Sequence, residues 1–114
     1  MFKPLLFTVP PHLGPLVFPK ATRAGMRAQS TCFVQEGDQP ITIHWEKDGR
    51  RISPSASLLV AQINDFTSMI TITNANAGHS GNYTCVASNT ASTVQTSASL
   101  AIKTFSDSNS LFHD

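Results

Sequence analysis

Two cysteines are the residues of this chain whose chemistry is easiest to specify. Cys32 and Cys85 are the 2 cysteines of a 114-residue sequence, and 53 positions separate them. Paired in an oxidising compartment, they would stabilise the folded chain by about 4 kcal/mol in the chain-entropy model. The alternative is two unpaired thiols, as expected in a reducing compartment. We predict a disulfide between Cys32 and Cys85.

A second reactive position is the run Asn82-Tyr83-Thr84. It has the Asn-x-Thr pattern to which N-linked glycans are attached in secreted proteins. Many such acceptors stay unused, so an unmodified Asn82 is the alternative. A glycan on Asn82 would agree with an oxidised cysteine pair and an extracellular protein.

The remaining reactive side chains form no catalytic or metal-binding pattern. The histidines lie in separate segments without the paired spacing of metal ligands: His12, His44, His79 and His113. The serines follow no nucleophile-elbow motif, and no glycine-rich loop is suited to hold phosphate. We therefore expect no catalytic residue, no metal, no cofactor and no enzymatic activity.

Trp45 and Tyr83, together with the two cysteines, indicate a fold. Side chains alternate between the two faces of a strand, so Tyr83 and Cys85 point the same way. A tryptophan between two cysteines and a tyrosine two residues before the second are the core of an immunoglobulin sandwich. In that fold the disulfide joins two sheets and the indole packs against it. The alternative is a coincidental tryptophan. We predict an all-β, immunoglobulin-like two-sheet sandwich with one inter-sheet disulfide.

Apolar and polar residues alternate over most of the chain, which predicts seven or eight strands and no long helix. The expected strands are 16–18, 26–34, 41–47, a short return strand from Arg50, 58–61, 68–73, 83–87 and 93–102. Asp48-Gly49 has the composition of a tight hairpin, 88–92 of a second hairpin, and 74–80 of a polar corner with room for a helical turn.

The same alternation predicts which side chains face the core. Residues that share the parity of Cys32 should face the core with it: Met26, Ala28, Ser30 and Val34. The same argument from Trp45 applies to Ile41 and Ile43. We also expect five later residues to face inward: Ile70, Ile72, Ala98, Leu100 and Ile102. Segment 58–61 is apolar on both faces, so its parity stays open. The short span between the cysteines leaves little room for the extra hairpin of a variable domain, which favours the I-set or constant type.

Composition limits the partners and the compartment. The net charge is +1 with 13% charged residues, and no basic run suggests nucleic acid or an acidic membrane surface. No apolar run is long enough to span a bilayer, so we expect no direct membrane insertion. We expect one domain at 10–102, an N-terminal extension or expression residues at 1–9, and a C-terminal tail or linker at 103–114.

Three segments carry a resemblance to a known family. They are 37–49 around Trp45, 64–68, and 79–89 with the run His-Ser-Gly-Asn-Tyr-Thr-Cys. Together they resemble immunoglobulin domains of the Down syndrome cell adhesion molecules of arthropods, from about Pro10 to Ile102. Two positions depart from that family. His79 replaces an acidic residue at the corner, which removes a charged anchor, and Ser92 replaces a glycine, which would cost about 1 kcal/mol if it were left-handed.

The resemblance implies recognition at the cell surface. Members of this family carry strings of immunoglobulin and fibronectin domains, and their variable immunoglobulin domains pair antiparallel with identical copies between cells. The chain is similar to the variable first domain of the shortened chelicerate forms, and a variable inner domain of the longer insect form is the alternative. The expected partners are therefore a second copy and the neighbouring immunoglobulin domains of a membrane-anchored parent.

The residues also suggest where such a contact would form. Asn82 faces outward from the sheet that holds Cys85, so a glycan there would crowd that sheet. The opposite sheet would present Arg27, Gln29, Thr31, Phe33, Leu59, Met69 and Thr71, a surface with little charge. We predict a two-fold symmetric self-contact through it. The alternative is that Phe33 and Met69 are scattered exposed residues or are covered by 16–18.

Two other functional classes are possible in principle. One is a heterophilic receptor or immune-recognition domain that binds another protein or a microbial surface. The other is an intracellular immunoglobulin domain of a muscle filament, which a disulfide and a glycosylation acceptor argue against because the cytosol keeps thiols reduced.

Overall fold

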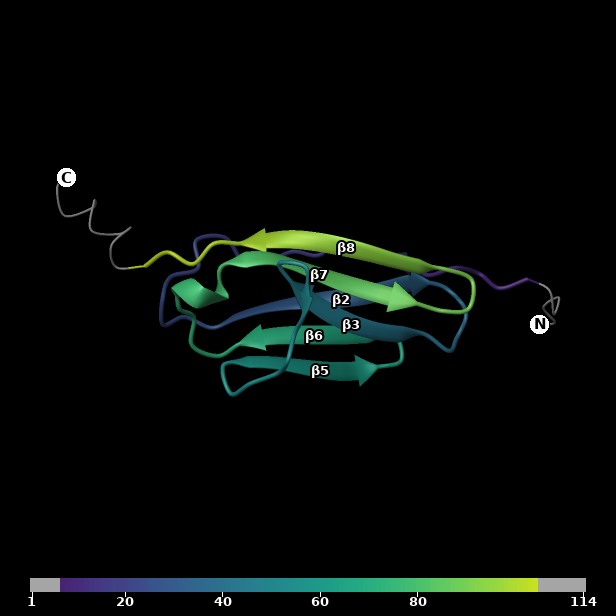
Figure 1. The fold of residues 1–114 in the computed structure, drawn as a ribbon, viewed down its shortest axis with the longest axis horizontal. Coiled ribbons are helices and arrows are strands. Elements are labelled where there is room, and N and C mark those ends of the chain that lie inside the picture. Colours follow the sequence, from purple (N-terminus) through teal and green to yellow (C-terminus); the bar gives the residue numbers. More distant parts are fainter. Residues whose placement is uncertain (1–6, 105–114) are drawn as a thin grey trace.

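The computed structural model describes residues 7–104, which form two antiparallel β-sheets packed face to face. The elements are β1 (His12–Leu13), β2 (Ala28–Glu36), β3 (Thr42–Lys47), β4 (Arg50–Arg51), β5 (Leu58–Asn64), β6 (Thr67–Ile72), a 3-10 turn η1 (Ala77–His79), β7 (Gly81–Ser88) and β8 (Thr93–Leu100). One sheet has the order β1-β2-β6-β5 and the other β4-β3-β7-β8 (Figure 1). The predicted immunoglobulin-like sandwich is confirmed.

The Cys32–Cys85 disulfide joins the two sheets, as predicted. Cys32 lies on β2 and Cys85 on β7, with Cα atoms 6.3 Å apart. Trp45 on β3 pairs with Cys85 in the ladder and is buried against the bridge. Its Nε1 donates a hydrogen bond of 2.9 Å to Oγ of Ser68, which pairs with Cys32 in the other sheet. The indole N–H therefore keeps a partner where water is excluded.

Tyr83 ties β7 to the corner that precedes it. Its ring is fully buried, with its centroid 5.1 Å from that of Phe18. The hydroxyl donates to the backbone carbonyl of His79 at 2.5 Å. Burial, aided by the negative charge of Asp48, raises the pKa of Tyr83 to about 12. The phenol therefore stays a hydrogen-bond donor throughout the neutral pH range.

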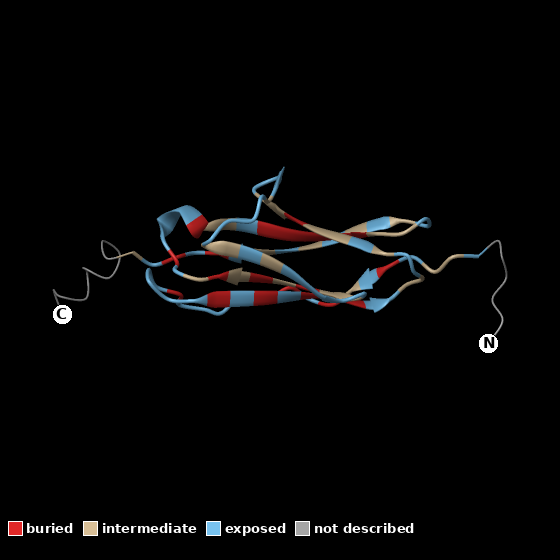
Figure 2. Cartoon of the chain, turned by 90° about the horizontal axis from the view of Figure 1, so that it is seen from below, coloured by how far each residue is buried: buried red, intermediate tan, exposed pale blue. Residues whose placement is uncertain are grey.

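Strand β2 alternates between buried and exposed side chains, as Figure 2 shows for the strands in general. Ala28, Ser30, Cys32 and Val34 are buried, which confirms their predicted parity. The prediction for Met26 is wrong, because this side chain is exposed. Met26 precedes the strand, and its carbonyl accepts from the backbone N–H of Ala75 instead of a β6 residue. Strand parity does not extend into this turn.

The predicted first strand over 16–18 is also wrong. The only regular strand before β2 within the described residues is β1, which pairs with the end of β2. Leu16 and Phe18 are nevertheless buried and Val17 is exposed. Pro15 and Pro19 lack the N–H donors that a ladder needs, so this segment packs through side chains without regular pairing. Ser30 Oγ adds one hydrogen bond of 2.6 Å to the carbonyl of Val17.

Both predicted hairpins form, but the turn of the second differs from the expected one. Asp48 and Gly49 both have positive φ, 52° and 83°, as a two-residue type I′ turn requires. Ser92 is not among the described residues with positive φ, so the expected strain does not arise. Instead the side chain of Asn89 accepts hydrogen bonds from the backbone N–H groups of Ala91 and Ser92. This Asx-type turn shapes the β7–β8 hairpin without a glycine.

The structure decides the parity of β5, which the sequence left open. Leu58 and Val60 pack against the core, while Leu59 and Ala61 face outward. The strand runs on to Asn64, with a register irregularity after Gln62. Leu59 therefore joins the outward residues of β2 and β6.

Among residues 7–104, the structure contains no helix with the length and apolar composition of a membrane span.

Candidate functional site

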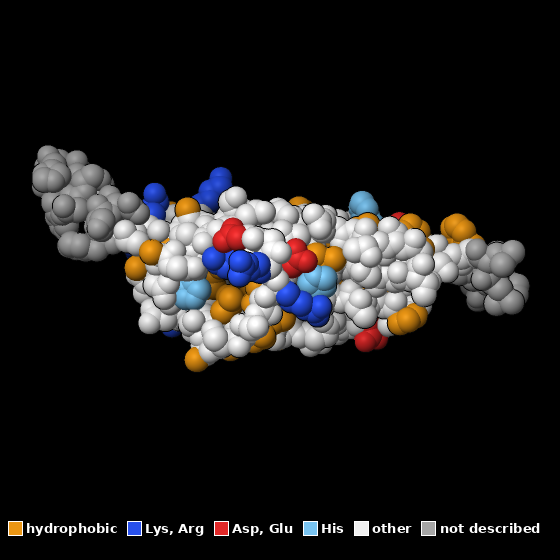
Figure 3. Space-filling view, in the orientation of Figure 1, with side chains coloured by type: hydrophobic (Ala, Val, Ile, Leu, Met, Phe, Trp, Pro, Cys, Tyr) orange, Lys and Arg blue, Asp and Glu red, His pale blue; other side chains and the backbone are white. Residues whose placement is uncertain are grey.

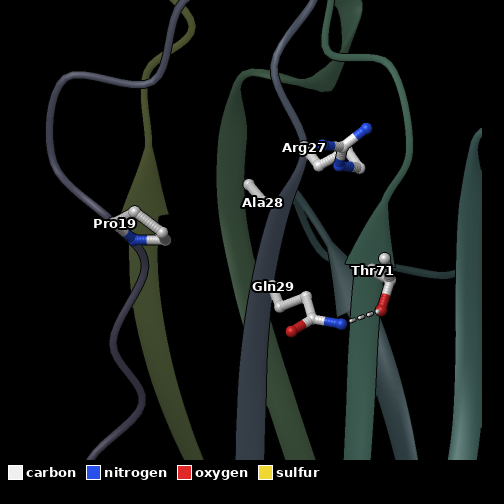
Figure 4. Close-up of a pocket in the computed structure, with 5 residues that line it drawn as sticks. All are labelled: Pro19, Arg27, Ala28, Gln29 and Thr71. Carbon is white, nitrogen blue, oxygen red and sulfur yellow. Dashed lines mark hydrogen bonds between the residues drawn. The ribbon is translucent and has the colours of Figure 1, made fainter.

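The seven residues predicted to form a contact surface lie together on the outside of the β1-β2-β6-β5 sheet. We call them the β2–β6–β5 face: Arg27, Gln29, Thr31, Phe33, Leu59, Met69 and Thr71. Ladder pairing places Gln29, Thr71 and Leu59 in one row across three strands, and Thr31 and Met69 in the next. Nε2 of Gln29 donates to Oγ1 of Thr71 at 3.3 Å (Figure 4). The structure therefore brings the predicted residues onto one surface.

Two large apolar side chains of this face are exposed. Phe33 is 49% exposed and Leu59 is 44% exposed, although both belong to regular strands. Segment 16–18 does not cover them, because Leu16 and Phe18 turn into the core. The alternative of coverage by this segment is thus excluded for Phe33.

Charge is separated along the length of the domain. The end of the sandwich where β2 begins carries Lys20, Arg23, Arg27 and Lys103, and the end where β2 stops carries Glu36, Asp38 and Asp65. Figure 3, which views the opposite sheet, shows Lys and Arg near the end where the described chain leaves and a mixed cluster of basic and acidic side chains over the middle. The strand centres carry no charge on this face. The domain is therefore basic at one end and acidic at the other.

An open hollow of about 480 Å³ lies at the basic end of the β2–β6–β5 face. It is lined by Pro19, Arg27, Ala28, Gln29 and Thr71, and Figure 4 shows the side chains of Arg27, Gln29 and Thr71 on neighbouring strands. Its lining has one charged group and no cluster of metal ligands or nucleophiles. A side chain from a partner surface could fill this hollow, whereas no catalytic arrangement is present in it.

The other sheet presents a contrasting surface, which we call the β3–β7–β8 face: Thr42, His44, Glu46, Asn82, Thr84, Val86, Ser88, Thr93, Gln95, Ser97 and Ser99. Its hydroxyl groups bond to one another across the strands. Oγ1 of Thr84 lies 2.7 Å from Oγ of Ser97, and Oγ of Ser88 lies 2.9 Å from Oγ1 of Thr93. Val86 points outward yet is only 5% exposed. The centre of this face is therefore bridged by side-chain hydrogen bonds between strands.

Asn82 lies at the start of β7 on the β3–β7–β8 face, with an exposed side chain. Its backbone N–H donates to Oδ1 of Asp48 at 2.9 Å, and its carbonyl accepts from the backbone N–H of Asp48. The hydrogen bond from the Asn82 backbone is the main reason that the pKa of Asp48 is lowered, and the bond from Lys47 contributes less. A side chain at Gly81 would come within 2.7 Å of the Asp48 carboxylate, so glycine allows this close approach.

A model of a known protein family matches most of the chain. The profile described as "Immunoglobulin I-set domain" matches residues 13–102. The chain belongs to the immunoglobulin I-set family. The match selects the I-set over the constant type, and an immunoglobulin domain of this kind is a non-enzymatic module. Tyr83 and the disulfide, predicted from spacing, occupy the places that the fold assigns them.

Relatives of the I-set domain are cell adhesion molecules. The rat "Cell adhesion molecule DSCAM" is 43% identical over 95 residues, which are 83% of this chain and 5% of that protein. "Cell adhesion molecule Dscam2" of Drosophila melanogaster is 36% identical over the same share of this chain. The chain thus spans about one-twentieth of the curated relatives. The resemblance to Dscam domains is confirmed, whereas the arthropod and chelicerate origin stays a prediction.

Solved structures support the same assignment. The "Dscam1 Ig7 domain, isoform 5" superposes with a TM-score of 0.80 and 31% identity, covering 83% of this chain and 98% of that chain. The titin "I-band fragment I67-I69" superposes with a TM-score of 0.75 and 31% identity over 83% of this chain and 33% of that chain. The fold is therefore shared by Dscam and titin domains.

His79 anchors the corner of the I-set domain in a way that the sequence analysis did not predict. Its imidazole is buried, and Nδ1 accepts a hydrogen bond of 3.0 Å from the backbone N–H of Asn76. The side chain of Asn76 in turn caps η1, so the two residues form a capping box. The corner is therefore anchored by a neutral imidazole in place of a carboxylate. The Asn-x-x-His spacing was the available signal.

Burial, followed by the positive charge of Lys47, lowers the pKa of His79. The second nitrogen, Nε2, lies 3.3 Å from Oγ of Ser57, in the segment that leads into β5. His44, by contrast, faces outward as predicted, and its Nε2 lies 3.0 Å from a carboxylate oxygen of Glu46. Residues 7–104 hold no group of three or more side chains suited to bind a metal ion. His113 lies outside the described residues.

Proposed function

We propose that this I-set domain is an extracellular recognition module that binds a second copy of itself, presented by another cell, through the β2–β6–β5 face. The observation that carries the proposal is the uncharged centre of this face, with exposed Phe33 and Leu59, between a basic end and an acidic end of the domain. A surface of this kind is complementary to its own copy after a half-turn.

The charge pattern selects the antiparallel arrangement. Arg27 and Gln35 each lie four residues from Thr31 along β2, which is about 13 Å in either direction. A two-fold axis near Thr31 would therefore place Arg27 level with Gln35 of the second copy. Asp65, at the tip of the neighbouring β5–β6 hairpin, supplies negative charge at that end. A parallel arrangement would instead bring like charges together, which is unfavourable.

The apolar centre supplies the attraction that charges alone do not. The flat surface around Thr31 and Met69 allows two sheets to approach, and Phe33 and Leu59 would lose most of their exposed area in the contact. Burying one such side chain contributes about 1.5–3 kcal/mol. Because a symmetric dimer contains each residue twice, a few side chains are enough for a weak, specific contact.

The relatives support placement at the cell surface. They are named cell adhesion molecules, and one structural neighbour is titled DSCAM "isoform 1.30.30, N-terminal eight Ig domains", with 31% identity, a TM-score of 0.79 and 13% of that chain covered. We infer that this domain, with boundaries near 10 and 102, is part of the ectodomain of a membrane-anchored protein. Neighbouring immunoglobulin domains would then be its partners within the same chain.

A charge-exchange experiment tests both the surface and its symmetry. One copy carries Arg27→Glu, and a second copy carries Asp65→Arg. Each copy alone would face its own like charges, whereas a mixture restores both attractive contacts of the antiparallel dimer. Beads coated with either copy should fail to aggregate, and mixed beads should aggregate with alternating partners.

The same beads separate self-recognition from heterophilic binding. A receptor for another protein would leave parent beads dispersed whatever their charge, and it would show no rescue in the mixture. Aggregation of both charge variants with themselves would overturn the assignment of this face. Sedimentation of each variant as a soluble, folded domain is the control for misfolding.

A further inference from the structure

We infer that Asn82 is an N-glycosylation site of this domain and that its modification must precede closure of the Cys32–Cys85 disulfide. Asn82-Tyr83-Thr84 is the single Asn-x-Ser/Thr run in the sequence. The inference rests on the extracellular placement proposed above but does not depend on self-association.

The finished domain has room for a glycan on Asn82. The side chain is exposed at the start of β7, and the two hydrogen bonds with Asp48 use the backbone of Asn82. The residue across the ladder on β8 is Ser99, which is small and exposed. A glycan would therefore project over the β3–β7–β8 face without displacing a packed side chain.

The finished domain nevertheless hides the rest of the acceptor. Tyr83 has no exposed surface, and Thr84 is 8% exposed with its hydroxyl bonded to Ser97 at 2.7 Å. Asn82, Tyr83 and Thr84 are all held extended in the ladder with β8. Because the transferring enzyme must recognise the hydroxyl of the third residue, a locked Thr84 cannot serve as part of an acceptor.

The disulfide sets the time at which the acceptor is lost. Cys85 directly follows Thr84, and its bond to Cys32 fixes β7 against the opposite sheet. Strand β8, which supplies Ser97, comes later in the chain. Thr84 is therefore accessible only before Cys85 is oxidised and β8 has paired. Glycosylation and disulfide closure compete for the same short segment.

The transfer step needs one co-reactant, a lipid-linked oligosaccharyl pyrophosphate. The anomeric carbon of its first sugar forms a bond with Nδ2 of Asn82, and the bond between that carbon and the pyrophosphate oxygen breaks. Nδ2 gives up one proton, and the lipid pyrophosphate leaves. Because no redox change occurs at Asn82, the reaction itself does not depend on the state of the cysteines, so any dependence reports on access.

Two measurements test the inference. The chain is secreted from eukaryotic cells through an added cleavable leader, and its intact mass is compared before and after treatment with a peptide N-glycosidase. We expect one glycan on the parent and on Thr84→Ser, which keeps the acceptor, and none on Asn82→Gln. A parent chain secreted with the unmodified mass would overturn the site.

The second measurement tests the order of events. Unglycosylated, oxidised domain and the same chain after reduction and alkylation are each offered to solubilised oligosaccharyltransferase with its lipid-linked donor. We expect modification of the reduced chain and not of the folded domain. Equal modification of both would overturn the ordering. Neither result depends on whether the domain self-associates, so a failure here is distinct from a failure of the proposed function.

Discussion

The outer faces of the two sheets differ in how their side chains are satisfied. On the β3–β7–β8 face, hydroxyl groups bond across strands, and the outward Val86 is almost fully covered by its neighbours. On the β2–β6–β5 face, Phe33 and Leu59 remain exposed, and the side-chain bond from Gln29 to Thr71 is long and solvent-exposed. One face is bridged by its own cross-strand hydrogen bonds, and the other leaves two large apolar side chains exposed.

The difference shows that sheets with the same architecture need not have the same role. Both faces consist of outward positions of antiparallel strands, and both contain few charges along the strand centres. What separates them is the identity of cross-strand neighbours, since Ser and Thr placed opposite each other bond, whereas Phe and Thr do not. Four predictions would break or sharpen this comparison.

The largest effect is expected at Phe33. Phe33→Asp should weaken self-association by about a hundredfold, because each symmetric dimer loses two buried rings at about 1.5 kcal/mol or more each. Sedimentation equilibrium measures this change. Val17→Asp is the matched control, since Val17 is 67% exposed but lies outside this face. Equal dimer fractions for the parent and Phe33→Asp would sink the surface assignment.

A smaller effect, on stability, is expected on the opposite face. Val86→Asn places an amide where the side chain is almost fully covered and should lower the free energy of unfolding by about 2 kcal/mol. Thr31→Asn, at an exposed centre position of the β2–β6–β5 face, should change it by less than about 0.5 kcal/mol. Urea denaturation measures both, and equal midpoints would contradict the contrast between the faces.

The cross-strand bonds should differ in the same direction. Ser97→Ala removes the 2.7 Å bond of Thr84 and should cost about 1 kcal/mol, because Thr84 is buried and keeps an unpaired hydroxyl. Gln29→Ala removes the 3.3 Å exposed bond to Thr71 and should cost a few tenths of that. Thermal unfolding of both variants checks the order, and a larger loss for Gln29→Ala would reverse it.

The smallest effect concerns the corner that joins the two sheets. Because the pKa of His79 is lowered from 6.5 in the folded state, the unfolded chain binds a proton more readily. Stability contributed by neutral His79 is therefore complete above about pH 6.5 and declines as the pH falls below that value. Comparing urea midpoints at pH 7.5 and 5.5 measures this decline.

His79→Gln is the control for the pH effect. Glutamine keeps an acceptor at the third position of the capping box but does not titrate. The variant should lose less stability than the parent between the two pH values. If it shows the same decline as the parent, other groups are responsible for the pH dependence.

Much of this fold could be predicted because strand parity is a local property. Cys32, Trp45 and Tyr83 predicted the core. The alternation of β2 and β6 predicted which side is buried, and Asp48-Gly49 predicted a hairpin. The errors occurred where local parity ends. Met26 precedes its strand, and 16–18 lies between prolines that cannot pair in a ladder.

The β2–β6–β5 face was predictable only in part, because strand parity does not determine which side of β5 faces outward. Outward positions on β2 and β6 follow from their buried neighbours, so Phe33 and Met69 could be placed. Leu59 could not, because both faces of 58–61 are apolar and only packing against β6 distinguishes them. Binding of a second copy is a property of two molecules, so the pattern of one strand does not encode it.

The sequence by itself determined the sandwich, its disulfide, its aromatic core and the glycosylation acceptor, because these depend on residue types and on spacings within single strands. Only the tertiary structure decided the parity of β5, the burial of His79 and Val86, and the separation of acidic and basic residues to opposite ends. Each of these depends on which distant segments become neighbours, and that is set by the packing of all strands together.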